Sequence, residues 1–275
     1  MAGTLYVVAT PLGNLGDLSP RAADTLKNVA VVAAEDTRHS KPLLVLAGSR
    51  AELISFHEHS TDRTLERILR ILGEGRDVAL ITDAGTPGIS DPGVALVAAA
   101  QERRIPVVTI PGPNAVAASV AVSGISGDRY LFLGFLPRKG SDRRRFLLTA
   151  AQSEWTVVLF EAPNRVTQLL ADLVEACGPD RRAAVSRELT KVFEETRSGT
   201  LQELSEHYAE APVRGEVTVV IAGTGKEHVE ERPPDPGERA RALLDEGLSR
   251  RDAANRLAEE TGISRNAAYR LVMEL

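Results

Sequence analysis

The residues best suited to hold a ligand lie at 82–93, where three glycines, two prolines and two aspartates directly follow the apolar run 77–81. Such a run is typical of a buried parallel strand, so the loop is expected at a strand's carboxyl end, where open α/β sheets bind ligands. Glycine allows the backbone to approach a ligand closely. Asp91 is expected to cap the next helix, with Pro92 as its first residue. The alternative is a tight structural turn.

Two similar glycine-proline loops follow other apolar runs, at 10–17 and 111–115. Three such loops at strand ends in one domain predict a shared ligand crevice. None ends in Gly-Lys-Ser/Thr, none has the spacing of a dinucleotide fingerprint, and no serine nucleophile elbow is present. The crevice therefore belongs to none of the common nucleotide-binding motifs.

An acidic cluster, Glu35-Asp36-Thr37-Arg38, follows the second apolar run. Two carboxyl groups at a strand's carboxyl end are suited to assist a reacting hydroxyl, and the alternative is a solvent-facing helix cap. The segment His57-Glu58-His59 places two imidazoles on one side of a strand or loop, but no third ligand can be assigned, so no metal site is predicted.

The formal net charge of −5 argues against a generally basic surface. Residues 138–145 nevertheless carry five basic side chains, which favours local phosphate binding. The alternative is a solvated helix start. The single cysteine, Cys177, is expected to be a buried apolar residue at a helix end. No membrane span or signal segment is predicted, so a cytoplasmic location is expected.

The elements that must position these residues alternate in type. Strands are predicted at 5–9, 29–34, 78–81, 106–110, 130–135, 156–160, 183–186 and 217–222. Helices are predicted at 19–28, 61–72, 92–103, 113–123, 164–177 and 201–209 from their three-to-four apolar spacing. This alternation indicates α/β architecture with largely parallel strands, and a mixed sheet in the second half.

A polar, proline-rich linker is predicted at 227–237, before a helical module at 238–275. Ser249 and Ser264 are expected to cap two helices that join near Gly262, as in a helix-turn-helix, with Arg265 and Arg270 facing outward. The alternative is a purely structural helical cap, because the module's charges balance. The preceding chain is divided into an amino-terminal α/β domain at 1–117 and a second at 118–226.

Taken in order, these segments resemble the bacterial ribosomal small-subunit RNA cytidine 2′-O-methyltransferases of the tetrapyrrole-methylase superfamily. The resemblance runs from residue 4 to the carboxyl terminus and is carried by 10–15, 35–38, 56–59, 82–93, 111–115, 134–139, 187–191, 251–254 and 264–269. It implies two α/β domains of tetrapyrrole-methylase type with a small helical module, S-adenosylmethionine bound between the domains, and usually a homodimer.

The resemblance also implies site residues. Cofactor contacts fall on Pro11, Leu12, Asp83, Gly85, Thr86, Asn114, Ala115, Phe160, Ser186 and Ile221. Asn164 stands where the family commonly has histidine, so no proton-transfer role is assigned to this position.

The implied reaction is 2′-O-methylation of a cytidine in the decoding region of small-subunit (16S) ribosomal RNA, free or in the assembled subunit. Methyl transfer from a sulfonium is an in-line displacement that needs no metal and no covalent enzyme intermediate. Glu35, with Asp36 as second choice, is the hypothesised proton acceptor. The RNA-binding residues are expected to be Arg38, Arg138, Lys139, Arg143, Arg144, Arg145, Arg265 and Arg270.

Two rival functions remain open at this point. One is methylation of a tetrapyrrole carbon by an enzyme of the same superfamily, which leaves the basic segment and the helical module without a role. The other is a ligand-sensing regulator that binds nucleic acid through its terminal helices, which leaves the acidic cluster unexplained.

Overall fold

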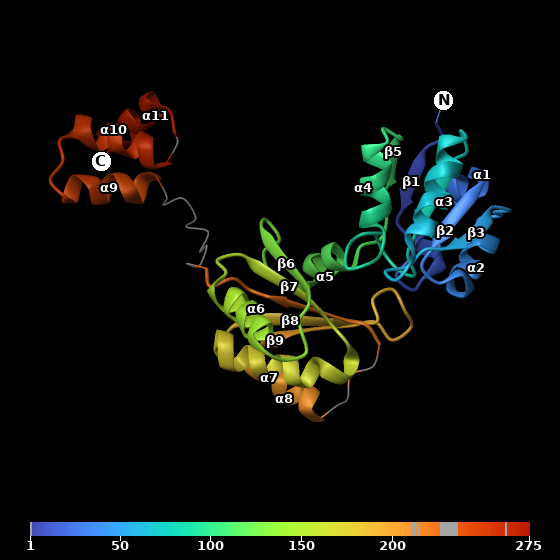
Figure 1. The fold of residues 1–275 in the computed structure, drawn as a ribbon. Helices are drawn as coiled ribbons and strands as arrows, with labels where there is room; N and C mark the ends of the chain where they lie inside the picture. Colours follow the sequence, from blue (N-terminus) through green and yellow to red (C-terminus); the bar gives the residue numbers. More distant parts are fainter. Residues whose placement is uncertain (1, 211–212, 214, 226–235, 262) are drawn as a thin grey trace. The chain divides into compact units, whose positions relative to one another are not determined.

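The computed structural model describes residues 2–210, 213, 215–225, 236–261 and 263–275. The chain divides into two compact units, Met1–Thr224 and Gly225–Leu275. The larger unit contains two five-stranded sheets, and the smaller unit is helical (Figure 1).

The first sheet is entirely parallel and has the order β3-β2-β4-β1-β5. Its strands are β1 (Leu5–Val8), β2 (Val31–Ala34), β3 (Glu52–Ser55), β4 (Val78–Ile81) and β5 (Val107–Ile110). The connecting helices are α1 (Pro20–Asn28), α2 (Thr37–Leu46), α3 (Asp62–Gly73) and α4 (Val94–Glu102), with a short 3-10 helix η1 at Leu15–Asp17. Strands β2 and β4 are buried at every residue, which requires apolar side chains on both faces of the sheet.

Alternate residues of β4 enter two different cores. Val78 and Leu80 pack with α3 and α4, whereas Ala79 and Ile81 pack with α1 and α2. The first sheet is therefore covered on both faces, and its functional side chains can emerge only at its edges or at its strand ends.

The second sheet is mixed, with the order β6-β7-β10-β8-β9. Its strands are β6 (Tyr130–Phe135), β7 (Thr156–Glu161), β8 (Arg182–Arg187), β9 (Glu195–Thr200) and β10 (Val217–Ile221). Only β6 and β7 pair in parallel; the other pairs are antiparallel. The helices are α5 (Ala115–Ser123), α6 (Ser141–Gln152), α7 (Val166–Cys177) and α8 (Leu201–Glu210), with a 3-10 helix η2 at Pro163–Arg165.

Helix α5 belongs to the second sheet. Val116 and Val120 pack against Val158, Ala184 and Val220, while α6, α7 and α8 supply the core on the other face. The domain boundary predicted at residue 117 falls inside this helix.

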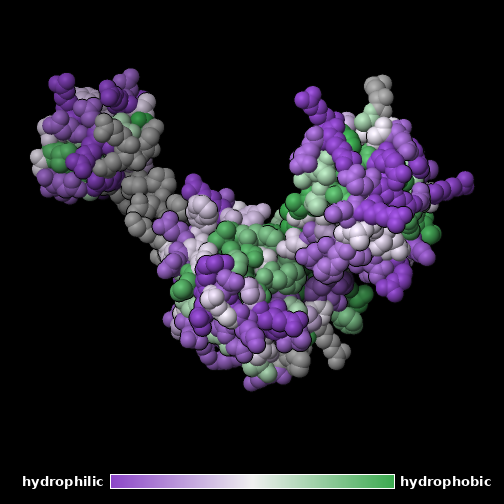
Figure 2. Space-filling view, viewed as in Figure 1, coloured by the Kyte–Doolittle hydropathy of each residue, from purple (hydrophilic) through white to green (hydrophobic). Residues whose placement is uncertain are grey.

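The smaller unit has three helices in its described residues, α9 (Pro236–Asp245), α10 (Arg250–Thr261) and α11 (Arg265–Met273), where the sequence predicted two. They share a small core that includes Leu243, Leu257 and Val272. The hydroxyl oxygen of Ser249 accepts from the Asp252 N–H at 3.2 Å, and that of Ser264 accepts from the Ala267 N–H, so both predicted caps are present. The face of the smaller unit that Figure 2 shows is mostly hydrophilic.

The sequence did not predict strands β3 and β9, because they carry few buried apolar side chains. Strand β3 buries only one of its four residues, and β9 is a polar edge strand.

The predicted cap at Asp91 is wrong: α4 begins at Val94 after Gly93, whose φ of 135° suits glycine. The predicted linker extends too far, since α9 begins at Pro236; residues 227–235 and the predicted stop at Gly262 lie outside the described residues. No described helix combines the length and the apolar character needed to span a membrane.

Candidate active site

The three glycine-proline loops meet at the carboxyl ends of β4, β1 and β5, which are neighbours in the first sheet. Thr10 and Gly85 exchange two backbone hydrogen bonds of 2.8 and 3.0 Å, joining the first loop to the second. The Thr86 hydroxyl donates to the Pro113 carbonyl oxygen at 3.2 Å, joining the second to the third. The sequence therefore predicted correctly which loops come together.

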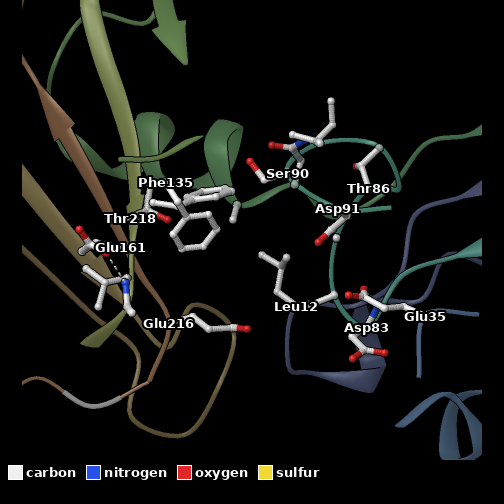
Figure 3. A pocket seen from close by; sticks show the side chains of 18 of the residues that line it. Leu12, Glu35, Asp83, Thr86, Ser90, Asp91, Phe135, Glu161, Glu216 and Thr218 are labelled. Carbon is white, nitrogen blue, oxygen red and sulfur yellow. Dashed lines mark hydrogen bonds between the residues drawn. The ribbon is translucent and has the colours of Figure 1, made fainter. Parts of the chain in front are cut away.

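Beside these loops is a cleft of about 450 Å³ that also touches the second sheet (Figure 3). Its lining from the first domain includes Leu12, Glu35, Asp83, Gly85, Thr86, Ser90, Asp91, Asn114 and Ala115. Its lining from β6, β7, η2 and β10 includes Phe135, Phe160, Glu161, Pro163, Glu216 and Thr218. Pro11 lines an adjoining cavity of about 370 Å³ that shares Leu12 and Asp83 with the cleft.

Two further expected cofactor contacts line neither the cleft nor the cavity at Pro11. Ser186 is buried, and its hydroxyl pairs with that of Thr196 at 2.9 Å. Ile221 is fully buried at the end of β10 in the core of the second sheet. Thr218, which lies beside Ser186 in the strand register, reaches the cleft instead. Of the two strands that carry these residues, β10 contributes to the lining of the cleft and β8 does not.

The cleft is strongly acidic. Five carboxyl groups line it, from Glu35, Asp83, Asp91, Glu161 and Glu216, and its described lining contains no lysine, arginine or histidine. Burial is the main cause that raises the pKa of Asp91 to about 6, and repulsion from Glu35, Asp83 and Glu216 adds to it. Burial, with the nearby Glu35 charge, also raises the pKa of Asp83. Such a site is complementary to a cation and unfavourable to phosphate groups.

Glu35 is held at the end of β2 with its carboxylate in the cleft. Its Oε2 accepts from the Thr82 hydroxyl at 2.7 Å and, at 3.5 Å, from the Asp83 N–H. Both hydrogen bonds recorded for this carboxylate end on the same oxygen, so Oε1 is available to accept a proton from a ligand hydroxyl.

Asp36 has a different task. Its Oδ1 accepts from the Arg38 N–H at 2.8 Å as the cap of α2, and its Oδ2 accepts from the Arg38 guanidinium at 2.9 Å. The hydrogen bonds from Arg38 lower the pKa of Asp36 to about 2. A carboxylate with so low a pKa is a weak base, so the helix-cap alternative holds for Asp36 and it is not a suitable proton acceptor.

Glu161 is a site residue that sequence reasoning missed. It is 1 % exposed, its Oε1 accepts from the Ala162 N–H at 2.9 Å, and its Oε2 lies 3.2 Å from Arg165 without a hydrogen bond of good geometry. A carboxylate at the end of an apolar strand was the available signal. Asn164, in η2, is exposed and is not among the lining residues.

Most of the expected RNA-binding residues are exposed: Arg38, Arg138, Lys139, Arg144, Arg145, Arg265 and Arg270. Arg143 is the exception and corrects the prediction. It is 8 % exposed, its guanidinium binds Asp172 at 2.6 and 2.8 Å, and it donates to the Pro137 carbonyl oxygen at 3.0 Å. Arg143 therefore fastens α6 to α7 and is not available to RNA.

The histidine segment and the cysteine that the sequence offered as candidates are not arranged for catalysis. Among the described residues, no group of three or more His, Cys, Asp or Glu side chains is arranged to hold a metal ion. The segment His57–Ser60 is a turn in which the His59 N–H donates to His57 Nδ1 at 3.2 Å. Cys177 is partly buried against the second core, and burial raises the pKa of its thiol.

This architecture is that of the tetrapyrrole (corrin/porphyrin) methylases, whose family model matches residues 4–205. A solved uroporphyrin-III C-methyl transferase from Thermus thermophilus, complexed with S-adenyl homocysteine, shares the fold at a TM-score of 0.57 and 19% identity, over 80% of this chain and 97% of that one. A second model, the RsmI C-terminal HTH domain, matches residues 230–275.

Full-length relatives narrow the class. Two proteins named ribosomal RNA small subunit methyltransferase I, from Synechocystis and Pseudomonas aeruginosa, are each 44% identical to this chain over 99% of its length and 98% of their own. The chain belongs to the ribosomal RNA small subunit methyltransferase I family.

Proposed function

We propose that the protein uses S-adenosylmethionine to methylate the 2′-hydroxyl of a cytidine in the decoding region of small-subunit (16S) ribosomal RNA. The observation that carries this proposal is the cleft lined by five carboxyl groups and, in its described lining, no basic side chain. A ligand with a sulfonium and an ammonium group is the kind that such a cleft favours. The ribosomal RNA substrate is suggested by the names of the full-length relatives.

The residues present fit this cofactor. Gly85 has a φ of 82°, and a Cβ there would lie 3.3 Å from Leu12 Cδ2, so glycine lets the loop approach a ligand closely. The buried Glu161 Oε2 lacks a hydrogen-bond donor that a polar ligand can supply. Leu12, Gly85, Thr86, Asn114, Ala115, Phe160 and Thr218 would form the surrounding contacts.

The cofactor supplies a methyl group whose bond to sulfur breaks, with the electron pair left on sulfur, as the ribose oxygen bonds to carbon. The protein must orient the ribose hydroxyl and accept its proton. Glu35 is placed to do this because Thr82 and Asp83 fix one carboxylate oxygen and leave the other to face the acceptor. Thr82, as a donor to Glu35, is a positioning residue.

The RNA backbone must be held outside the acidic cleft. Arg38, whose side chain is 87% exposed, stands beside the cavity that adjoins the cleft, and Arg138, Lys139, Arg144 and Arg145 surround the start of α6. Arg265 and Arg270 of α11 would add phosphate contacts from the helical unit. The protein is proposed to act in the cytoplasm, on free or assembled small-subunit RNA, as a homodimer.

A labelled-methyl assay tests the proposal directly. Small ribosomal subunits from a strain that lacks the gene are incubated with the full-length protein and S-adenosylmethionine labelled in its methyl group, and the labelled nucleotide is mapped. Label on the 2′-oxygen of one cytidine is expected. Absence of transfer to subunits and to free RNA alike would refute the proposal.

A Glu35→Gln variant tests the proton acceptor. Turnover should fall by at least about a hundredfold, in the range typical of a lost general base, while the dissociation constant of the methyl donor changes little. Glu74→Gln, an exposed position at the end of α3, is the matched control. Turnover by the Glu35→Gln variant equal to that of the control would remove Glu35 from the mechanism.

A further inference from the structure

A second cavity, separate from the one lined by Pro11, also adjoins the cleft. It has a volume of about 590 Å³, which lies within the usual range for small-molecule sites. Its lining includes the turn formed by His57, Glu58 and Ser60, together with Thr61, Asp62 and Leu65 at the start of α3. This turn carries two imidazoles on either side of a carboxyl group, and neither metal binding nor the proposed donor contacts give it a function.

The cavity shares a wall with the cleft. Glu35, Ser90 and Asp91 line both spaces, and Figure 3 shows Glu35, Ser90 and Asp91 around the cleft. The two spaces therefore meet at the proposed proton acceptor. A ligand hydroxyl in the second cavity and a methyl donor in the cleft would therefore both lie beside Glu35.

Two hydrogen bonds close this exposed turn. The His57 N–H donates to the Ser60 hydroxyl oxygen at 2.8 Å, and the Ser60 N–H donates to the His57 carbonyl oxygen at 2.8 Å. Since His57 Nδ1 accepts from the His59 N–H, its Nε2 is the nitrogen that carries the proton of the neutral ring. His57 thus presents a donor next to Glu58, whose carboxylate is an acceptor.

The charge of the cavity decides which part of an RNA can enter. Glu35, Glu58, Asp62 and Asp91 line it, and its described lining contains no lysine or arginine. Phosphates are repelled by such a surface, whereas a neutral base and its ribose are not. Unstacked bases in RNA are commonly recognised by stacking on aromatic side chains and by hydrogen bonds to their Watson–Crick edges.

We propose that this second cavity receives the acceptor nucleoside and that Glu58 and His57 read its base as cytosine. This inference rests on the proposed function. The Glu58 carboxylate accepts from the exocyclic N4 amino group, as acidic side chains do with cytosine, and His57 Nε2–H donates to N3 or O2. The ribose lies toward the shared wall, with its 2′-hydroxyl at Glu35.

Uracil does not match this arrangement. It presents the O4 acceptor where cytosine presents the N4 donor, so the Glu58 carboxylate would face another oxygen in place of a donor. A glutamine at position 58 offers an amide N–H as well as a carbonyl oxygen, and can therefore pair with either base. Glu58 is a specificity residue in this assignment, and the chemical step stays with Glu35.

The test compares the full-length wild-type protein with Glu58→Gln on two unmethylated small-subunit substrates, one with the natural acceptor cytidine and one with uridine at that position. The kcat/KM ratio for cytidine over uridine should fall at least about tenfold in the variant, with the change mainly in KM. Binding of S-adenosylmethionine, measured by calorimetry, should be unaltered because Glu58 does not line the cleft.

Two further variants make the result specific. Asp62→Asn removes a charge from the same cavity and should leave the ratio unchanged, and His57→Phe keeps an aromatic ring but removes the donor, which should raise KM for cytidine. An unchanged ratio in Glu58→Gln, or a fall in Asp62→Asn alone, would overturn the assignment. If wild-type protein methylates neither substrate nor free RNA, the proposed function fails, whereas methylation with an unchanged ratio defeats only this inference.

Discussion

Asp91 provides a quantitative test of the acidic cleft. Its pKa is raised from 3.8 to about 6, first by burial and then by repulsion from the other carboxyl groups. A carboxyl group with a raised pKa in the folded state contributes stability that is fully present below the unfolded value and is lost as the pH rises through about 6. At neutral and alkaline pH, the ionised Asp91 therefore destabilises the fold.

The size of this effect follows from the shift. About two pKa units correspond to about 3 kcal/mol, and because the group is only about half-buried, solvent screening reduces this to about 1 kcal/mol. Asp91→Asn should thus raise the free energy of unfolding by about 1 kcal/mol near pH 8, and the gain should shrink to a few tenths by about pH 4.

Urea denaturation at the two pH values measures the change, with Glu74→Gln as the control that removes an exposed carboxyl group away from the cleft. Asp91→Asn should also bind S-adenosylmethionine more weakly, because the sulfonium loses its attraction to the Asp91 carboxylate. Binding of the thioether product, which has no sulfonium charge, should change less. Equal stability of Asp91→Asn and wild type at both pH values, or a loss near pH 8, would refute the repulsion argument.

Four other predictions follow from the geometry. Gly85→Ala should weaken donor binding several-fold in calorimetry, because alanine is strained at a φ of 82° and its Cβ would lie 3.3 Å from Leu12 Cδ2. Unaltered binding would contradict the role proposed for the Gly85 loop in holding the donor. Arg143→Ala should reduce the free energy of unfolding by about 3 kcal/mol, because it leaves Asp172 without its partner, and should not alter the salt dependence of RNA binding. Arg144→Ala with Arg145→Ala should instead leave stability nearly unchanged and lower the steepness of that salt dependence by about 1.4, and an unaltered slope would remove both from the RNA surface. A chain ending at Thr224 should retain donor affinity but bind small-subunit RNA less tightly, because 225–275 is a separate unit.

Sequence patterns located the site better than they located single side chains. Strands β2 and β4 are apolar on both faces. The acidic cluster follows β2 and a glycine-proline loop follows β4, so strand ends and candidate site residues could be predicted together. Loops from neighbouring strands of a parallel sheet necessarily lie at one edge. This constraint is why Glu35 and the three loops could be placed at one site without a structure.

Tertiary partners explain the predictions that failed. Arg143 stands in a run of basic residues that looks solvated, yet Asp172, twenty-nine positions away, makes it a buried ion pair. Strand β9 has no apolar period because it pairs only with β8 at the edge of the sheet and none of its residues is fully buried. Ser186 and Thr218 are adjacent in the sheet, and only the packing around the cleft decides which one lines it.

The distribution of charge connects the chemistry to turnover. The chain has a net charge of −5 and concentrates five carboxyl groups in the cleft. In the proposed mechanism, exposed arginines outside the cleft hold RNA phosphates, and the carboxyl groups in the cleft repel them. Only a neutral nucleoside can then approach Glu35, which separates binding of the polyanion from alignment of the reacting hydroxyl. Methyl transfer also removes the positive charge that the carboxyl groups attract. The arrangement that destabilises the fold through Asp91 therefore favours release of the neutral thioether product and its replacement by a new cationic donor.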